Sequence, residues 1–384
     1  MSILDKKLIK NLDYFTIAVV FALVCFGLVS IASIMASPFD GKEATLSDYI
    51  QKLNLEYVER QIVNFLVGIA AMLIVLVIDY HMLKGFINYI YYANVALLLI
   101  LLLAGESTRG IFGWFKIGTR MFQPSELCKI SLIVMISKIV SDSMDRDGSL
   151  KRFKEIMKAL VYFIVPFFLV YKQPDMGTAF VFIAILFCIF FVGRINWKYI
   201  AGAVLFSAAA LPLTYFYLIT PDQKNRIDSF LNPGRDARGL DYNVIQSKTS
   251  IGSGQLNGRG FFTDGTLAQL KYVPERHTDF VFSGIVEGVG FIGGTILIAL
   301  YFVLIFRWLW IAAKAKDNFG TCLVTGCLGM LAAHVFENVG MTMGLMPVTG
   351  IPLPFISYGG SNLLTNMIAV GIVLNVWMRR PARR

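Results

Sequence analysis

Residues Lys271–Gly294 read KYVPERHTDFVFSGIVEGVGFIGG and join a charged turn to a long apolar segment. Four ionisable side chains crowd the turn: Glu275, Arg276, His277 and Asp279. A further carboxylate, Glu287, follows inside the apolar run. Because a charged group at the centre of a membrane helix costs about 2.5–3.5 kcal/mol on insertion scales, it usually faces a cavity or a partner. The stretch predicts a membrane protein with polar chemistry at one end of an apolar helix.

The composition of the whole chain agrees with this interpretation. Of its 384 residues, 56% are hydrophobic and 16% are charged, and the mean hydropathy is +0.65. An ordinary soluble domain is roughly 25% charged. The net charge of +10 would suggest nucleic-acid binding in a soluble chain. Here the basic residues flank apolar runs, as in membrane proteins, so we expect no nucleic-acid partner.

Apolar runs long enough to span a bilayer recur along the chain. They cover residues 14–36, 61–79, 86–104, 125–141, 156–171, 178–193, 198–218, 280–306, 321–343 and 355–378. The first run is longer than the hydrophobic part of a signal peptide, which has about 7–15 residues, so we expect it to be retained. The sequence predicts an all-α polytopic membrane protein with about ten transmembrane helices.

An even number of spans places both termini on one side of the membrane. Lys and Arg are concentrated in the short segments on that side, which predicts cytoplasmic termini. Residues 219–278 then form a large extracytoplasmic loop between the seventh and eighth helices, within a single domain, 1–384. The loop contains several glycines: Gly252, Gly254, Gly258 and Gly260. No strand precedes them, so a nucleotide loop is excluded, and turns or close approach of the backbone to a ligand are expected.

No metal or cofactor motif is present. The five cysteines lack metal-ligand spacing, and the chain has no CxxC, HExxH or Ser-His-Asp order. We expect no fixed metal site and no cofactor. A divalent cation, Mg²⁺ or Mn²⁺, is compatible with the oxygens of Asp175, Asp279 or Glu126, although no spacing demands it.

Two polar motifs lie on the predicted outer side. In QPSELCK, Gln123–Lys129, the side chains of Glu126 and Lys129 are three residues apart, so they share a helix face and can pair. This pair either eases insertion or belongs to a functional site. In KQPDMGTA, Asp175 fits a helix N-cap, and capping is favoured over a functional role when the motif is considered alone.

The PERHTDF turn allows two interpretations of Asp279. Thr278 or Asp279 could cap the helix that follows. Alternatively, Asp279 is a general base, since acid–base sites often collect ionisable neighbours such as those found here. A helix N-terminus would lower the pKa of Asp279 and burial would raise it, so the direction is open at the level of sequence.

The segment Glu337–Asn362, ENVGMTMGLMPVTGIPLPFISYGGSN, contains Pro347, Pro352 and Pro354. Proline disrupts regular helix, and irregular backbone at membrane depth is tolerated only when it is buried or lines a cavity. We therefore expect a broken stretch here, with Glu337 and Asn338 facing inward. His334 is three residues before Glu337 and is expected to pair with it.

These motifs together resemble the SEDS family of cell-wall polymerases, which includes RodA, FtsW and SpoVE, and are most like its RodA members. The matching pieces are QPSE with Lys129, QPDMGTA, the Gly-rich loop, ERHTDF, GFIGG and PVTGIPLPFISYGGS, in the family order. The resemblance implies ten transmembrane helices and peptidoglycan glycosyltransferase activity on lipid II. It also implies partnership with a class B penicillin-binding protein that cross-links the strands, and with other elongation-complex membrane proteins.

The resemblance also assigns residues. Asp279 matches the family's essential carboxylate and is our candidate catalytic base. The candidate substrate-binding residues are Trp114, Glu126, Lys129, Asp175, Arg109, Arg120, Arg276, His277, Glu275 and Ser357. Departure of a pyrophosphate needs positive charge or a metal ion, for which Lys129, Arg109, Arg120 and Arg276 are the candidates. Where the family usually has two glutamates, this chain has Glu287 followed by Gly288, which leaves the role of Glu287 open.

The sequence is also compatible with two other classes of function. A flippase for lipid-linked precursors would suit buried charges and broken helices, but the chain shows no paired repeat halves. A scaffold that only recruits the transpeptidase is a third possibility. The sequence does not separate elongation from division or sporulation, because those paralogues share the motifs.

Overall fold

The structure, a computed structural model, describes residues 10–37, 52–104, 106–108, 111–118, 120–213, 215–216, 219–232, 240–263 and 265–380. Each predicted apolar run overlaps a helix, although run 198–218 extends past the end of its helix at Leu213 and run 355–378 begins before its helix starts at Gly360. These helices are α2 (Tyr14–Met35), α4 (Leu55–Val77), α5 (Tyr80–Ala104), α6 (Pro124–Asp147), α7 (Phe153–Lys172), α8 (Met176–Val192), α9 (Trp197–Leu213), α12 (Val281–Ala313), α13 (Asn318–Thr342) and α14 (Gly360–Met378). The predicted helical fold is confirmed.

In the described part of the chain, six of these helices are long and apolar enough to cross a membrane: α2, α4, α5, α12, α13 and α14. Helix α8 and the first part of α9 are shorter apolar helices. Helices α6 and α7 fall outside this group, and both carry charged residues along their length. The chain is therefore a membrane protein with several spans, and the number ten stays a prediction.

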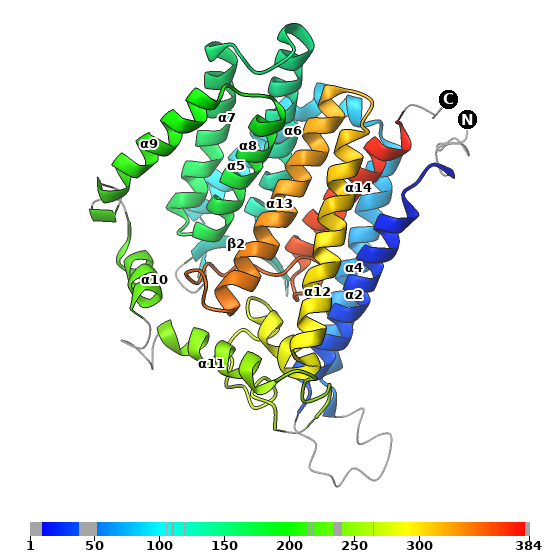
Figure 1. Ribbon diagram of the computed structural model, residues 1–384, viewed down its shortest axis with the longest axis vertical. Coiled ribbons are helices and arrows are strands. Elements are labelled where there is room, and N and C mark those ends of the chain that lie inside the picture. The colour runs from blue at the N-terminus through cyan, green and yellow to red at the C-terminus, as the bar shows by residue number, and fades with distance from the viewer. Residues whose placement is uncertain are drawn as a thin grey trace.

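Contacts between turns show that the chain runs back and forth between two ends of one bundle (Figure 1). At one end the contacts are Arg307–Asp13, Arg379–Asp79, His81–Asp317 and Leu150–Gly193. At the other end they are Arg276–Ile34, Gln173–Leu98 and Gln123–Asp175. The start of α2 and the end of α14 thus share an end, as an even number of crossings requires.

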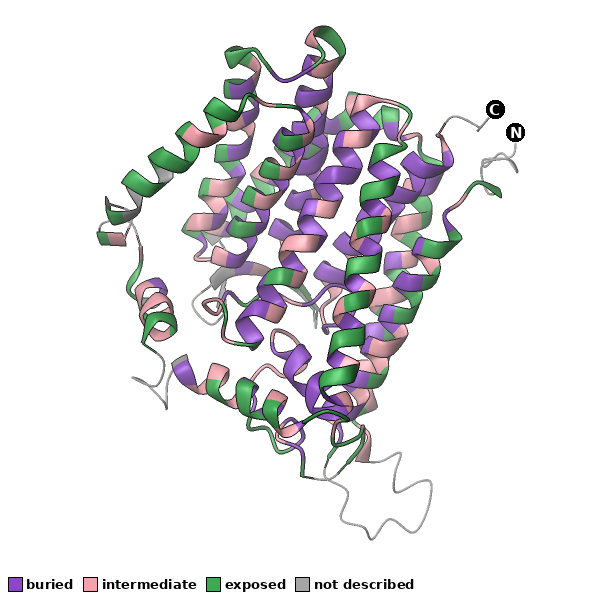
Figure 2. Cartoon of the chain, viewed as in Figure 1, coloured by how far each residue is buried: buried purple, intermediate pink, exposed green. Residues whose placement is uncertain are grey.

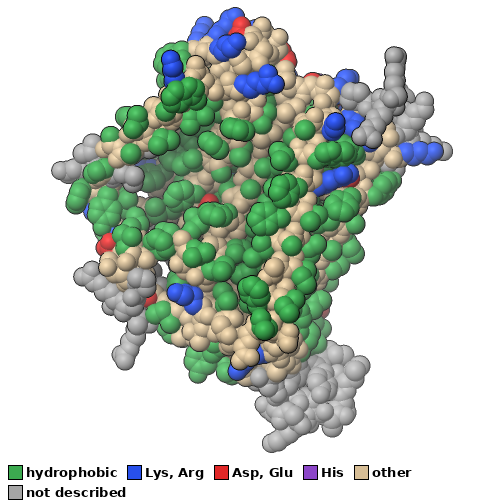
Figure 3. All heavy atoms as spheres, in the orientation of Figure 1, with side chains coloured by type: hydrophobic (Ala, Val, Ile, Leu, Met, Phe, Trp, Pro, Cys, Tyr) green, Lys and Arg blue, Asp and Glu red, His purple; other side chains and the backbone are tan. Residues whose placement is uncertain are grey.

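Helices α13 and α14 form the centre of the bundle, where burial is greatest (Figure 2). In the most apolar 18 residues of each helix, 72% of the residues of α13 and 89% of those of α14 are buried. The corresponding shares are 17% for α4 and 28% for α12. The outer helices expose large apolar side chains, and in Figure 3 these cover the middle of the visible face. Lys and Arg gather at the upper end, over the turn from α6 to α7. Such a wide apolar surface fits contact with lipid.

A small sheet departs from the all-α prediction. Strands β1 (Glu106–Thr108), β2 (Ile111–Ile117) and β3 (Arg120–Phe122) pair in the order β1-β2-β3, all antiparallel. The strand β2, IFGWFKI, is rich in β-branched and aromatic residues, which favour strands. It was missed because runs this short carry little periodicity. The sheet packs against α5, α6 and α14 and leads directly into α6.

The described parts of the segment between α9 and α12 include two helices. These are α10 (Pro221–Leu231) and α11 (Leu240–Ser253), and they lie at the end of the bundle opposite the start of α2 (Figure 1). Helix α10 begins with a capping box, in which the Thr220 hydroxyl accepts from the Gln223 amide and the Gln223 side chain accepts from the Thr220 amide. Helix α11 packs on α12 and α13.

The glycine-rich turns after α11 dock on the backbone of α12. Helix α12 is interrupted at Gly290, whose φ is 72°. The amides of Arg259 and Gly260 donate to the carbonyls of Glu287 and Gly288, both at 2.9 Å, and so replace helix bonds lost at the interruption. A Cβ on Gly258 would lie 2.2 Å from the Gly288 oxygen. The turns expected here are present, and the close backbone contact that the structure shows is with α12.

Glu287 fixes the same loop by its side chain. Its fully buried carboxylate accepts hydrogen bonds from four donors: the Ser250 hydroxyl at 2.8 Å, the Ser253 hydroxyl at 3.2 Å, the Leu267 amide at 2.7 Å and the Ala268 amide at 3.1 Å. Arg259 is 3.9 Å away. Since these donors satisfy the carboxylate fully, Glu287 joins the loop to α12 without a second glutamate.

Candidate active site

Asp279 lies in a tight turn just before α12. The helix is capped by Phe280, and no side chain forms a cap hydrogen bond there. The Thr278 hydroxyl instead bonds to Glu275, at 3.2 Å from its carboxylate. The interpretation of Thr278 or Asp279 as a helix cap is therefore wrong. The side chain of Asp279 is half-buried, so it remains within reach of a ligand.

Neighbouring segments hold the backbone around Asp279. The Asn338 amide, from α13, donates to the Asp279 carbonyl at 2.8 Å and to the Ile351 carbonyl at 2.7 Å. The Ser357 hydroxyl donates to the Thr278 carbonyl at 2.6 Å and accepts from the Leu353 amide at 2.8 Å. Two separate parts of the chain, α13 and the stretch before α14, thus hold the backbone at Thr278 and Asp279.

The broken stretch predicted before α14 forms one wall of the site. Residues 344–359 are irregular, and four of their apolar side chains are buried: Ile351, Leu353, Phe355 and Ile356. Gly350 has a φ of 75°, and a Cβ built on it would lie 3.6 Å from Oδ2 of Asp279. The positive φ favours glycine at this position, where the backbone lies beside the carboxylate. The prediction of buried, irregular backbone is confirmed.

Asp175 does cap its helix, as predicted. Its Oδ1 accepts from the Thr178 amide at 3.0 Å, and its Oδ2 accepts from the Gln123 side-chain amide at 3.1 Å. Gly177 packs so closely on Ile351 that a Cβ there would clash at 2.3 Å. The QPSE and PDMG motifs therefore meet each other and adjoin the segment that passes Asp279.

Glu126 and Lys129 form the predicted pair, at 2.7 Å, and both are buried. The Lys129 ammonium also lies 2.8 Å from Nε2 of His334 on α13. His334 therefore contacts Lys129, and the expected pairing with Glu337 is wrong. On α13, His334 and Asn338 are four residues apart, about 6 Å along the axis. One turn of that helix thus separates the Lys129 contact from the Asp279 contact.

The other charged residues of the turn serve the surrounding structure. The Arg276 guanidinium donates to the Ile34 carbonyl at 3.2 Å, and burial lowers the pKa of Arg276 from its ordinary value. The His277 ring packs on Tyr57 and Tyr358, with centroids 4.9 and 5.7 Å apart. The structure thus places Glu275, Arg276 and His277 beside Asp279 along the chain, and their binding roles stay predictions.

The remaining candidates are located only in part. Trp114 is half-buried in β2, opposite Glu106 of β1. Arg120 begins β3, and its side chain is not described; Arg109 lies outside the described residues. Among the described residues, no three His, Cys, Asp or Glu side chains are grouped closely enough to hold a metal ion.

Sequence reasoning missed three positioning contacts: those of Gln123, His334 and Asn338. The sequence did contain a signal for His334 and Asn338. Together with Glu337 they are polar residues at helical spacing within an otherwise apolar segment. Glu337 and Asn338 are buried, as expected. Their partners could not be predicted, since Asn338 is 59 residues from Asp279.

Known proteins resemble this chain over most of its length. The sequence model of the FtsW/RodA/SpoVE family, described as "Cell cycle protein", matches residues 14–381. Peptidoglycan glycosyltransferase MrdB of Escherichia coli is 39% identical over 84% of this chain and 86% of its own length. Stage V sporulation protein E of Bacillus subtilis is 32% identical over 95% of this chain and 96% of its own.

Solved structures agree. One chain, from work described as "Structural coordination of polymerization and crosslinking by a peptidoglycan synthase complex", has a TM-score of 0.77 at 26% identity, covering 95% of this chain and 97% of that one. The rod shape determining protein RodA of Thermus thermophilus has a TM-score of 0.68 at 26% identity, covering 97% and 98%. With a family match over nearly its whole length, this chain belongs to the FtsW/RodA/SpoVE, or SEDS, family.

Proposed function

We propose that the chain is a peptidoglycan glycosyltransferase that polymerises lipid II at the outer face of the cytoplasmic membrane during rod-shaped growth. The observation that carries this proposal is the carboxylate of Asp279. It is half-buried at one end of the bundle, and the backbone carbonyl of Asp279 is held by the side-chain amide of Asn338. A carboxylate held in this way suits proton transfer.

In the proposed reaction, Asp279 accepts the proton of a sugar hydroxyl as that oxygen attacks the anomeric carbon of a second lipid-linked sugar. One glycosidic C–O bond forms, the bond between the sugar and the pyrophosphate breaks, and the polyprenyl pyrophosphate leaves with the bonding electrons. General-base catalysis of this kind contributes about 10²–10⁴-fold. The apolar faces of the helices would accommodate the polyprenyl chains.

The leaving pyrophosphate requires compensation of negative charge. Arg276 lies in the same turn as Asp279, whereas Lys129 is buried and paired with Glu126. Roles for Arg109 and Arg120 in this compensation belong to the proposal. A divalent cation would supply the same charge compensation, and Asp175 would be one of its weaker oxygen ligands because each of its oxygens already accepts a hydrogen bond.

The membrane orientation and the partner are part of the same proposal. Both termini are cytoplasmic, ten helices cross the bilayer, and residues 219–278 lie outside. We infer a class B penicillin-binding protein as partner, since a similar structure is described as a complex for polymerization and crosslinking.

Purified protein tests the function, with and without that partner, on labelled lipid II in the presence of moenomycin to silence contaminating glycosyltransferases. We expect glycan ladders from the wild type and none from Asp279→Asn. Ladders of equal intensity from both proteins would refute the assignment of Asp279. Transfer of labelled lipid II across proteoliposomes without ladders would instead favour the flippase.

A further inference from the structure

A cavity of about 140 Å³ lies between α10, α11 and the turn that follows α13. Its walls are partly apolar, with Phe230, Val244, Met346 and Pro347, and two cations, Arg226 and Lys248, also line it. The size is close to that of cavities, about 150 Å³, that hold a six-membered ring. The cavity therefore has room for a small organic group rather than for a lipid tail.

The two cations have no acidic partner in the described part of the chain. Arg226 donates one of its five N–H groups to the Val348 carbonyl at 3.1 Å. No ion pair joins Arg226 or Lys248 to a described carboxylate. Asp241, which also lines the cavity, is bonded by the Ser229 hydroxyl. The lining thus carries two cations against one carboxylate.

Lys248 depends on a glycine for its position. A Cβ built on Gly344 would lie 3.1 Å from Cδ and 3.7 Å from Nζ of Lys248, and 3.2 Å from Val244. Gly344 has a φ of 72°, which side-chain-bearing residues rarely adopt. Because residue 344 is a glycine, it places no side chain in the space beside Lys248, and the lysine side chain can extend to the cavity.

A short loop connects this cavity to Asp279. Val348, bound by Arg226, is two residues before Gly350, which passes against the Asp279 carboxylate. Two extended residues span at most about 7 Å. A molecule that presents a hydroxyl to Asp279 can therefore place a neighbouring group in the cavity.

We propose that this cavity is a second substrate subsite, which binds an anionic group next to the reacting sugar of the lipid-linked precursor. The proposal rests on the proposed function. Two substituents of such a precursor are anionic: the carboxylates of its peptide and the pyrophosphate of its lipid. Lys248 and Arg226 supply charge-assisted hydrogen bonds to the anion, and the apolar wall receives the carbon atoms beside it.

Initial rates of lipid II polymerisation, measured against substrate concentration, test the subsite. We expect Lys248→Gln to raise KM about tenfold while kcat stays within about twofold, since one hydrogen bond to a charged group is lost. Lys248→Arg should retain the wild-type KM. Lys224→Gln is the matched control, because Lys224 lies on α10 and its ammonium sits over the Tyr215 ring rather than in the cavity.

A substitution that fills the cavity tests the subsite independently. Val244→Trp should also raise KM, with an unchanged melting temperature showing that the protein is folded. A precursor whose peptide carboxylates are amidated identifies the anion. If the effect of Lys248→Gln disappears with this precursor, the subsite binds the peptide. If the effect persists, it binds the pyrophosphate.

The proposal is overturned if Lys248→Gln and folded Val244→Trp both keep KM within twofold of the wild type while Asp279→Asn abolishes polymerisation. In that case the proposed function stands without the subsite. A wild-type protein that makes no polymer would contradict both.

Discussion

Asp279 and Glu287 are carboxylates at the same end of α12, yet their surroundings give them different roles. Glu287 is fully buried and accepts four hydrogen bonds, two from the end of α11 and two from the loop that follows it. Asp279 is half-buried, and the contacts that fix it involve its backbone carbonyl. The first arrangement stabilises structure, and the second keeps a partly exposed carboxylate at the end of the bundle.

Replacing Glu287 tests its structural role. We expect Glu287→Gln to lower the free energy of unfolding by about 2 kcal/mol, because the new amide NH₂ faces donors where an oxygen accepted their hydrogen bonds. Thermal unfolding in detergent measures this loss. Glu56→Gln is the control, since Glu56 forms an exposed helix pair with Arg60. Equal stability of both variants would show that Glu287 does not hold the loop.

Replacing Asn338 tests the positioning of the base. Asn338→Ala removes the donor shared by the Asp279 and Ile351 carbonyls, and we expect kcat for polymerisation to fall at least about tenfold with little change in KM. Asn366→Ala is the matched control, because within the described part of the chain the Asn366 amide donates to Asn362 of the same helix, α14. An unchanged kcat in Asn338→Ala, with the fold intact, would exclude a positioning role.

At the scale of elements, the docking of the glycine-rich turns on α12 depends on close backbone contact. We expect Gly258→Ala to destabilise the protein, since the added Cβ would meet the Gly288 carbonyl and Gly258 has a φ of 81°. Gly252→Ala is the control, because a Cβ there meets nothing within 4 Å. Protease cleavage of the loop measures the effect, and equal resistance of both variants would contradict the docking described here.

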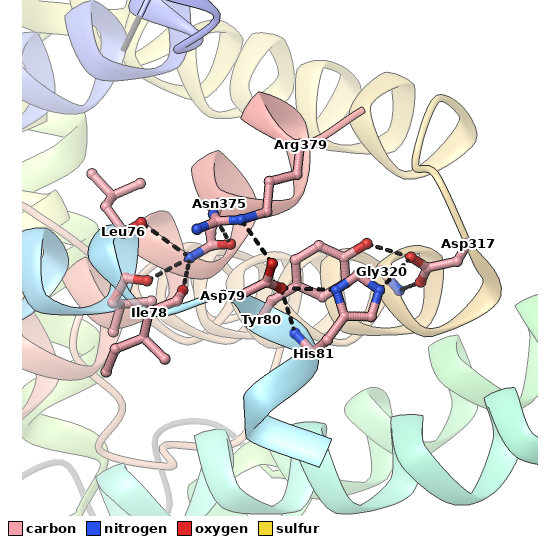
Figure 4. A network of polar contacts seen from close by, with 10 residues as sticks. Leu76, Ile78, Asp79, Tyr80, His81, Asp317, Gly320, Asn375 and Arg379 are labelled. Carbon is pink, nitrogen blue, oxygen red and sulfur yellow. Dashed lines mark hydrogen bonds and ion pairs between the residues drawn. The ribbon is translucent and has the colours of Figure 1, made fainter. Parts of the chain in front are cut away.

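A polar network ties helix ends together at the opposite end of the bundle (Figure 4). His81 bridges Asp79 and Asp317, at 2.8 and 3.0 Å, and Arg379 pairs with Asp79 at 3.3 Å. Burial raises the pKa of Asp317, but hydrogen bonds from Tyr80, the Gly320 amide and His81 outweigh it and hold the pKa below 3.8. The turns before α5 and α13 and the end of α14 are thereby joined.

This network predicts a dependence of stability on pH. A carboxyl whose pKa is lowered in the folded state stabilises the protein above its unfolded pKa and loses that contribution as pH falls through the folded value. We therefore expect stability to decline below about pH 3.8, the ordinary value for aspartate. Asp317→Asn should flatten this decline in melting curves recorded from pH 6 to pH 3. An identical decline in the variant would contradict the prediction.

The elements differ in how far the sequence predicted them. Each of the ten apolar runs proved to overlap a helix, since length and hydropathy are local properties. The sheet before α6 was missed because its strands have three to seven residues. The partner of His334 was predicted wrongly, because helical spacing favours Glu337, whereas packing of α13 on α6 brings Lys129 within 2.8 Å.

At the scale of the whole molecule, the order of the motifs predicted the family, but their meeting point required the fold. Gln123 and Asp175 touch, Gly177 packs on Ile351, and Gly350 passes Asp279, although these residues are far apart in sequence. No local pattern contains such contacts. The sequence therefore identified Asp279 as a candidate catalytic residue, but it did not identify the residues that hold Asp279 in position.

The orientation in the membrane is a prediction at this scale. We expect a single cysteine placed at Lys224 to react with a membrane-impermeant thiol reagent in intact cells, and one placed at Arg152 to react only after lysis, in each case in a background without the five native cysteines. The two positions belong to opposite ends of the bundle. Reaction of the Arg152 position alone in intact cells would reverse the proposed orientation.

The central claim is that Asp279 is the base in glycan polymerisation. The most direct measurement is the steady-state rate of lipid II polymerisation by wild type and Asp279→Asn, together with the affinity of each for lipid II. We predict that kcat falls about 10²–10⁴-fold while lipid II still binds with near wild-type affinity. A variant that polymerises within a few-fold of the wild-type rate would contradict the account.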